Sequence, residues 1–317
     1  MHHPSKRDAP DDGPRETRAV AAQRANVPTQ HRRMASPIRQ RRFVQCDVFT
    51  SVPTKGNGLA VVADGEGLSD QEMQAFAAWT NLAETTFLMP PTTEGADYKL
   101  RIFTPNRELP FAGHPTLGSC ASWRHLGGKS RTAGVVRQEC SIGIVDIDVS
   151  GAVPAFAAPK TTIAPLPPEN LEAIISALGL PQDRIVRTAQ LANGPVWQVL
   201  ELASAADVLA ADSARIRYPE FLGVGLIGPH SPGAECQFEV RTLATSSGMS
   251  EDPITGSLNA AIAQWMYGAG HWRAPVTVAQ GTCIGREGRL FIHRDDKTGI
   301  VWVGGETRIL IEGTLTL

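Results

Sequence analysis

Two short segments of this chain place histidine, carboxylate and hydroxyl side chains next to a glycine. They are GHPT at residues 113–116 and EDPITGS at residues 251–257. Histidine and carboxylic acids are the side chains that most often carry protons in enzymes. The glycines and polar residues of interest in the two segments are Gly113, His114, Asp252, Thr255, Gly256 and Ser257. This combination favours acid/base chemistry.

Each glycine is followed at once by a run of helical character that ends on a tryptophan, Trp123 or Trp265. Pro115 suits the first turn of a helix, where a backbone N–H would have no partner in any case. The free N–H groups and the dipole at a helix start favour an anion. Either segment alone is more often ordinary helix capping. As a pair beside acidic residues, they predict a site that binds a carboxylate.

A third acidic residue, Glu84, begins the apolar stretch ETTFLM. Such a carboxylate either lies on the solvent face or points into a pocket, where desolvation raises its pKa toward that of a proton carrier. Composition alone favours the solvent face. His114 could instead be a structural histidine without a catalytic role. Asp252 could instead be a charge partner of the helix start. Arg101 and Arg241 are expected to form structural pairs rather than substrate clamps.

The elements that must position these residues occur twice. Residues 98–123 and 238–265 both begin as an aromatic-x-x-Arg strand, pass through a polar loop, and reach a glycine and a helix. A second echo relates Asn57-Gly58 before LAVV to Asn193-Gly194 before PVWQVL. Internal repeats of this kind indicate duplicated structural units. We expect two half-domains that face each other across one cleft.

The predicted fold class is α+β, with two pseudo-symmetric lobes, each a curled, mostly antiparallel and barrel-like sheet around a central helix. The sequence predicts helices at 70–79, 114–126, 169–178 and 257–267, strands at 84–89 and 135–140, and a linker at 151–168. Ser69 and Glu72 form a capping box for the first helix. We expect an N-terminal lobe at 42–155, joined by the last strand at 305–317, and a C-terminal lobe at 156–304. Residues 1–41 are predicted to be a disordered tail, or a misassigned start with translation beginning at Met34.

Composition excludes several classes of function. The chain has 317 residues, 42% of them hydrophobic, and a net charge of -2. Residues 1–42 hold ten Lys/Arg and four Asp/Glu, so the remainder carries -8, which argues against a nucleic-acid surface. No apolar run reaches the roughly 20 residues needed to span a bilayer. Five scattered cysteines suggest reduced thiols in a cytoplasm. Neither a metal-ligand spacing nor a nucleotide-binding motif is present.

Taken together, these segments resemble the phenazine-biosynthesis F (PhzF-like) isomerase family. The matching pieces are DVFTSVPTKGNGLAVV, NLAETTF, ADYKLRIFTPNRELPFAGHPTLG, EDPITGS and the closing AQGTCIGREGRL…VWVGGETRILIEGTLTL. The resemblance covers roughly residues 43–317. It departs from the usual pattern at Gly58, Ala83 and Asn259, which leaves the substrate open.

Family membership implies a fold like that of diaminopimelate epimerase, an isomerisation without cofactor, and a homodimer. By that resemblance Glu84 is the base and acid that moves a proton from one carbon to another. His114, Asp252 and Ser257 position the substrate and assist the transfer. The substrate-binding residues are expected to be Asn57, Gly113, Thr255 and Gly256. Phenazine production by this protein does not follow from the resemblance.

We therefore expect a cytoplasmic isomerase that acts on a small, carboxylate-bearing substrate, cyclic or amino-bearing. The alternative is a small-molecule binding protein that kept the cleft and lost the reaction. Only the enzyme needs Glu84 inside the cleft. A racemase with two catalytic thiols is disfavoured, because no cysteine stands beside a glycine at a helix start.

Overall fold

The computed structural model describes residues 38–245 and 249–317, and residues Ser36–Leu317 form one compact unit. Nearly all of the predicted tail therefore lies outside the described residues, and the first strand begins at Gln40, slightly before the predicted start at 42. In the described residues the helices are α1 (Asp70–Thr80), α2 (Gly113–His125), α3 (Pro168–Leu178), α4 (Ala205–Ala210) and α5 (Gly256–Gly268). The strands are β1 (Gln40–Val48), β2 (Asn57–Val62), β3 (Glu84–Met89), β4 (Tyr98–Phe103), β5 (Glu108–Leu109), β6 (Val135–Cys140), β7 (Gly143–Asp148), β8 (Ala155–Ala157), β9 (Thr162–Ala164), β10 (Ile185–Ala192), β11 (Val196–Leu202), β12 (Val224–Pro229), β13 (Phe238–Leu243), β14 (Glu251–Asp252), β15 (Val276–Gln280), β16 (Gly288–Arg294), β17 (Val301–Gly304) and β18 (Thr307–Thr316).

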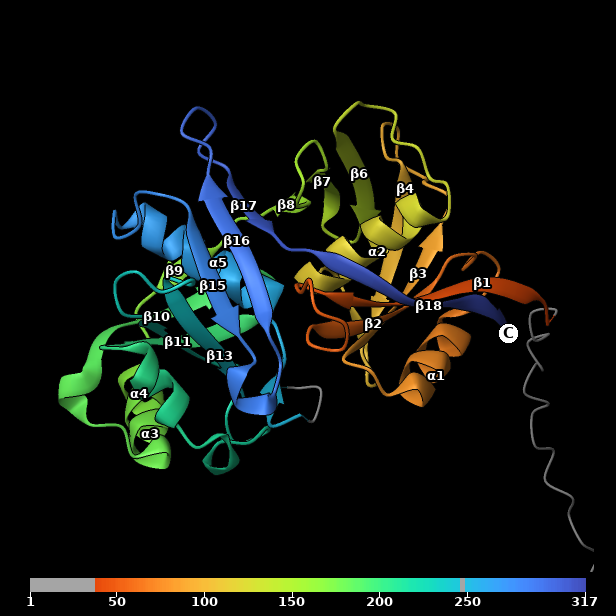
Figure 1. Ribbon diagram of the computed structural model, residues 1–317. Coiled ribbons are helices and arrows are strands. Elements are labelled where there is room, and N and C mark those ends of the chain that lie inside the picture. Colours follow the sequence, from red (N-terminus) through yellow and green to blue (C-terminus); the bar gives the residue numbers. More distant parts are fainter. Residues whose placement is uncertain (1–37, 246–248) are drawn as a thin grey trace, which may run out of the picture. The chain divides into compact units, whose positions relative to one another are not determined.

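The strand pairings repeat from one half of the unit to the other. In the first lobe β1–β2, β3–β4 and β6–β7 are antiparallel, whereas β2–β3 and β4–β6 are parallel. In the second lobe β10–β11, β12–β13 and β15–β16 are antiparallel, whereas β11–β12 and β13–β15 are parallel. The short strands β5 and β14 pair with β4 and β13 in the same way. Figure 1 shows the two lobes that these repeated pairings build.

Two strands tie the halves together. The last strand, β18, returns to pair antiparallel with β1 in the first lobe (Figure 1). Strand β8 pairs with β7 of the first lobe and β17 of the second, so the strands form one continuous sheet. The predicted linker at 151–168 is therefore wrong in part, because it contains β8 and β9. The division proposed between residues 155 and 156 falls inside β8.

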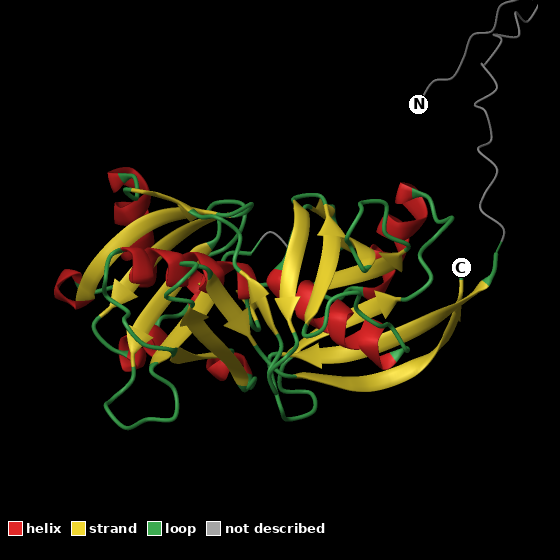
Figure 2. Ribbon diagram, turned by 90° about the horizontal axis from the view of Figure 1, so that it is seen from above, coloured by secondary structure: helices red, strands yellow, loops and turns green. Residues whose placement is uncertain are grey.

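One buried helix fills each curled sheet, α2 in the first lobe and α5 in the second, and Figure 2 shows the sheets curving around them. Small residues let these helices lie close to the strands. A Cβ added at Gly118 would lie 2.6 Å from Leu59 Cδ2 and 2.8 Å from Val48 Cγ2. Because such distances are shorter than real contacts, a larger residue there would displace these core side chains. Gly118 thereby lets the middle of α2 lie close to β1 and β2.

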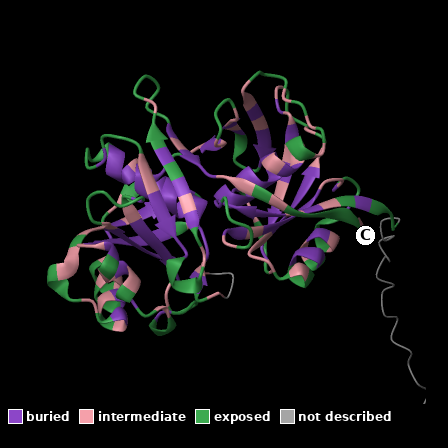
Figure 3. Cartoon of the chain, in the orientation of Figure 1, coloured by how far each residue is buried: buried purple, intermediate pink, exposed green. Residues whose placement is uncertain are grey.

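The outer helices cover the remaining apolar surface. Helix α1 begins with the predicted capping box, in which Ser69 and Glu72 exchange hydrogen bonds, and it packs Met73 and Phe76 against the first sheet. Helices α3 and α4 cover the second sheet. The main core spans both lobes (Figure 3). Within the described ranges, no helix is both long and apolar enough to cross a membrane.

Candidate active site

The starts of α2 and α5 meet where the two lobes join. A Cβ added at Gly113 would lie 2.8 Å from Gly256 Cα, and one added at Gly256 would lie 2.9 Å from Gly113 Cα. Backbone atoms cannot yield at such distances, so only glycine permits this contact. Ala112 and Thr255 are the N-cap residues, and among the described residues no side chain caps either helix. Backbone N–H groups of both helix starts therefore remain for an anion.

Asn57, at the start of β2, connects the two lobes. Its Nδ2 donates to Asp252 Oδ1 at 3.2 Å and to the Ile254 carbonyl at 3.0 Å, both in the second lobe. The same Nδ2 lies 3.3 Å from His114 Nδ1 in the first lobe. Two oxygen acceptors fix which end of the amide is the nitrogen. The Asn57 side chain is buried, so its hydrogen bonds form a fixed link, or strut, between the two lobes.

The contact with Asn57 sets the tautomer of His114. An amide nitrogen can only donate, so Nδ1 of the ring accepts, through an N–H of Asn57 that is shared with a second acceptor, and Nε2 carries the hydrogen. Nε2 lies 3.3 Å from Glu84 Oε2, with the His114 and Glu84 side chains 5% and 16% exposed. The geometry is too poor for a hydrogen bond, and in the described part of the chain neither atom has another partner. Burial lowers the pKa of His114 to about 3, so this pair is not an ion pair at neutral pH.

Two carboxyl groups share this region, and both titrate above their ordinary range. Burial raises the pKa of Glu84 well above its usual value, and the negative charge of Asp252 raises it further. Burial also raises the pKa of Asp252, although hydrogen bonds from Thr255 and Asn57 act in the opposite direction. Neighbouring acids that resist ionising together are a common arrangement for proton transfer. A carboxyl group with a raised pKa, such as Glu84, is suited both to remove and to return a proton.

A buried hydrogen-bond network holds the second helix start. Gln280 accepts from Thr255 N at 3.0 Å and from Asn259 Nδ2 at 2.8 Å. Its Nε2 donates to Thr242 Oγ1 at 3.1 Å and to Thr255 Oγ1 at 3.0 Å. Thr255 Oγ1 in turn donates to Asp252 Oδ2. Asp252 is thus held from both lobes, by Asn57 on one side and Thr255 on the other.

A cavity of about 310 Å³ opens between the lobes beside these groups. Its polar lining includes Glu84, Asp252, Thr255 and Ser257. The apolar residues that line it are Ala83, Leu109, Phe111, Ala112, Pro195, Val196, Trp197, Leu222 and Met249. Polar groups gathered within an apolar wall are typical of a site for a small organic molecule.

The structure brings all eight predicted residues into one region. Glu84, Asp252, Thr255 and Ser257 line the cavity. Asn57 and His114 form the polar chain behind it, and Gly113 and Gly256 form the contact between the helices. Composition favoured the solvent face for Glu84, but the side chain lies in the cavity.

Sequence reasoning missed several residues of the site. Asn193 donates to the Ser257 carbonyl at 2.8 Å and accepts from Trp197 Nε1 at 3.2 Å. This orients the tryptophan in the cavity wall. The echo of Asn57 at Asn193 was the available signal. Arg107 also lines the cavity. Gln280 gave no signal, because its partners are distant in sequence.

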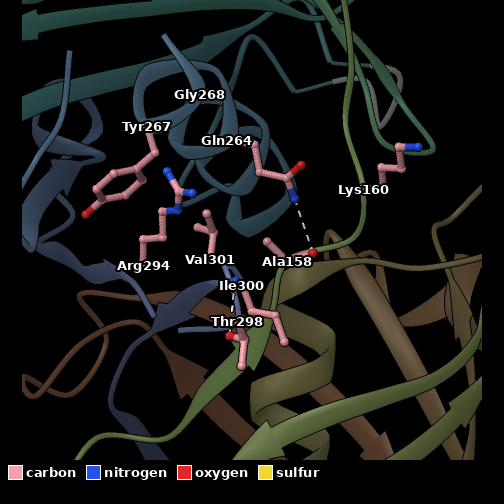
Figure 4. Close-up of a pocket in the computed structure, with 10 residues that line it drawn as sticks. Ala158, Lys160, Gln264, Tyr267, Gly268, Arg294, Thr298, Ile300 and Val301 are labelled. Atoms are coloured by element: carbon pink, nitrogen blue, oxygen red, sulfur yellow. Dashed lines mark hydrogen bonds between the residues drawn. The ribbon is translucent and has the colours of Figure 1, made fainter. Parts of the chain in front are cut away.

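A second hollow, of about 380 Å³, lies on the C-terminal lobe and shares no lining residue with the cavity. Figure 4 shows its polar side chains, which include Lys160, Gln264, Tyr267, Arg294 and Thr298. No carboxylate lines it. Among the described residues, no group of three or more His, Cys, Asp or Glu is placed to hold a metal ion. The cavity between the lobes is therefore the candidate active site.

Comparison with known proteins assigns the family. Residues 46–313 match the family model described as phenazine biosynthesis-like protein. Antisense-enhancing sequence 1 of Schizosaccharomyces pombe is 34% identical over 86% of this chain and 97% of that protein. Trans-2,3-dihydro-3-hydroxyanthranilate isomerase of Pseudomonas aeruginosa is 31% identical over 86% of this chain and 98% of that protein.

Solved structures support the same fold. The crystal structure of a PhzF-family protein from Bacillus anthracis superposes with a TM-score of 0.74 at 19% identity, covering 88% of this chain and 100% of that one. The predicted fold class is confirmed by this likeness and by the repeated strand pairings. The chain thus belongs to the PhzC-PhzF, or phenazine biosynthesis-like, family, and it is an isomerase of that family.

Proposed function

We propose that this isomerase moves a proton between two carbon atoms of a small carboxylate-bearing substrate, without a cofactor, in the cavity between the lobes. The observation that carries the proposal is the position of Glu84. Its carboxyl group lines the cavity with a raised pKa, close to a neutral histidine and to two uncapped helix starts.

In the proposed reaction the Glu84 carboxylate removes a proton from one substrate carbon. The electron pair moves through the adjacent double bond, and the protonated Glu84 returns the proton to a second carbon. No net proton is gained or lost, and the enzyme is regenerated. A positioned acid/base group of this kind contributes roughly 10²–10⁴-fold in rate.

The surrounding residues would orient the substrate. Backbone N–H groups at the starts of α2 and α5, with Ser257, would bind its carboxylate. Asp252 would accept a hydrogen bond from a hydroxyl or amino group, and a cationic amine there would relieve the repulsion that Asp252 exerts on Glu84. His114 Nε2 lies 3.3 Å from Glu84 Oε2, and after a small movement of either side chain it would donate to the carboxylate form. The apolar wall excludes water from the transfer.

The test is an isomerisation assay in D₂O, followed by ¹H NMR. The first compound to try is trans-2,3-dihydro-3-hydroxyanthranilate, because a relative is named as its isomerase; a panel of small cyclic and amino-bearing carboxylates follows. We expect isomerised product, either with deuterium on the receiving carbon or with the original proton transferred internally.

The key variant is Glu84→Gln, with the exposed Glu94→Gln on a surface loop as its control. Glu84→Gln should lose turnover and keep its fold, whereas Glu94→Gln should match the wild type. Turnover of Glu84→Gln near the wild-type rate would reject Glu84 as the proton carrier. Binding of these compounds with no movement of a carbon-bound proton would favour the alternative of a binding protein.

A further inference from the structure

Both lobes contain an arginine–glutamate pair at matching positions. In the first lobe Arg101 on β4 binds Glu108 on β5, and in the second Arg241 on β13 binds Glu251 on β14. The strand registers are equivalent, since Phe103 pairs with Glu108 as Leu243 pairs with Glu251. The expectation that both arginines form structural pairs is confirmed. The two pairs nevertheless differ in environment.

The pair in the second lobe is buried. The side chains of Arg241 and Glu251 are 2% and 0% exposed, against 19% and 36% for Arg101 and Glu108. Arg241 Nε lies 3.1 Å from both oxygens of Glu251, and Nη2 lies 2.6 Å from Oε2. Burial alone would lower the pKa of Arg241, but the hydrogen bonds and charge of Glu251 outweigh it and raise that pKa. Arg241 therefore keeps its positive charge in the buried pair.

Arg241 also ties the pair to the end of α4. Its Nη1 donates to the Val208 carbonyl at 3.1 Å and to the Ala211 carbonyl. One guanidinium thus joins β13, β14 and α4 in a fixed geometry, which a planar, five-donor group allows. Strand β14 has only two residues, so its backbone hydrogen bonds to β13 are too few to fix its position.

The second residue of β14 is Asp252. In the first lobe the equivalent register position holds Leu109, since Ile102 pairs with Leu109 as Thr242 pairs with Asp252. Only the buried pair therefore sits beside a cavity carboxylate. The charge of Glu251 also acts on its neighbour and raises the pKa of Asp252, after the larger effect of burial.

We propose that Arg241 is a positioning residue for Asp252: its buried pair with Glu251 fixes β14, so that the Asp252 carboxylate meets Asn57 and faces the cavity. This inference rests on the proposed function for its effect on rate. Buried ion pairs contribute little net stability, so a role in specifying one geometry accounts better for this pair.

The charged groups around Asp252 come from several elements. Glu84 approaches it from β3, His114 from α2 through Asn57, and Glu251 adjoins it on β14. Arg241 on β13 has Cys283 and Glu239 as further charged or titratable neighbours. Removing both members of the pair leaves the other groups in place. It removes the Glu251 charge that raises the pKa of Asp252.

The test compares two matched double variants. Arg241→Met/Glu251→Leu removes the buried pair without leaving an unpaired charge. Arg101→Met/Glu108→Leu removes the more exposed pair and leaves only Asp70, which is 85% exposed, without its arginine partner. We expect the first to lose about 10²-fold in kcat/KM, as small misplacements of reacting groups do. The acid limb of its pH profile should also move to higher pH, because the lost hydrogen bond from Asn57 raises the pKa of Asp252 by more than the lost charge of Glu251 lowers it. The control should stay within about fivefold of the wild type, with an unchanged profile.

A second readout needs no substrate. The side-chain amide signals of Asn57, assigned by comparison with Asn57→Asp, report whether Asp252 Oδ1 stays in place. We expect them to shift in Arg241→Met/Glu251→Leu and not in the control. If both the signals and kcat/KM stay at wild-type values in that variant, the positioning role is overturned.

These outcomes separate the two proposals. A wild type that turns over no compound while the Asn57 signals still move would reject the proposed function and keep the role of Arg241. If Arg241→Met/Glu251→Leu does not fold, Arg241→Lys keeps the charge and loses the two-pronged contact. The same shift of the Asn57 signals is then expected, and its absence would overturn the role.

Discussion

Replacing Asn57 with leucine removes the strut between the lobes while keeping the volume of the side chain. The amide donates to Asp252 and to the Ile254 carbonyl, and contacts His114. A buried hydrogen bond to a charged group is worth about 1.5–3 kcal/mol and a neutral one about 0.5–1.5 kcal/mol. We therefore expect a loss of about 3–5 kcal/mol in the free energy of unfolding, or a Tm about 10 °C lower.

The same substitution should change the titration of Asp252. The hydrogen bond from Asn57 lowers the pKa of that carboxyl group, against the larger opposing effect of burial. Its loss should raise the pKa of Asp252 further, because the burial that raises this pKa is then less strongly opposed. The acid limb of turnover should move to higher pH. Thermal unfolding and ¹³C NMR titration of labelled aspartate measure the two effects separately.

Asn193 provides the matched control. It occupies the echoed position in the second lobe and donates to the Ser257 carbonyl. Asn193→Leu should also lower the Tm but leave the titration of Asp252 unchanged. A Tm of Asn57→Leu within about 2 °C of wild type, with the same Asp252 midpoint, would refute the role given to this residue.

Gly113→Ala should lower the free energy of unfolding by about 1–3 kcal/mol, because the added Cβ would lie 2.8 Å from Gly256 Cα. The control is Gly268→Ala in α5, where the added Cβ meets open space and should not destabilise the protein. Chemical denaturation of both variants measures the difference. Because the pKa of His114 falls to about 3, its contribution to stability is full above pH 6.5 and is lost as pH falls toward 3. His114→Gln should therefore lose less stability than wild type between pH 6.5 and 4, and equal losses in urea melts would contradict this. The raised pKa of Glu84 has the opposite sign: its stabilisation is present at acid pH and lost as pH rises through the folded pKa, so Glu84→Gln should have the higher Tm at pH 9, and a lower one would count against burial of the charge.

Local signals in the sequence predict much of the fold. The capping box at Ser69 and Glu72 and the strands at 84–89 and 135–140 occur at the predicted residues, because capping and β-branched runs act over a few residues. The strands inside the predicted linker were missed. Strands β8 and β9 have three residues each, too few for a periodic pattern, and their partners β17 and β10 are remote in sequence.

The sequence was enough to predict which residues form the site, but not how their side chains are arranged. The duplicated glycine segments indicated two helix starts at one cleft, and the direct contact of Gly113 with Gly256 explains why both are glycine. The direction of Glu84 depends on the opposite lobe and was open in the sequence. The wall residue Trp197 and the hub Gln280 are fixed by long-range contacts that no local pattern encodes. The homodimer and the cytoplasmic location stay predictions.

The central claim is that Glu84 is a proton carrier held in a water-poor cavity next to a second carboxyl group. Its most direct test is a ¹³C NMR titration of labelled glutamate, with the Glu84 signal assigned through Glu84→Gln. We predict a midpoint well above the ordinary value of about 4.3, falling in Asp252→Asn because the repulsion is removed. A Glu84 midpoint that lies near the ordinary value and does not change in Asp252→Asn would contradict the central claim.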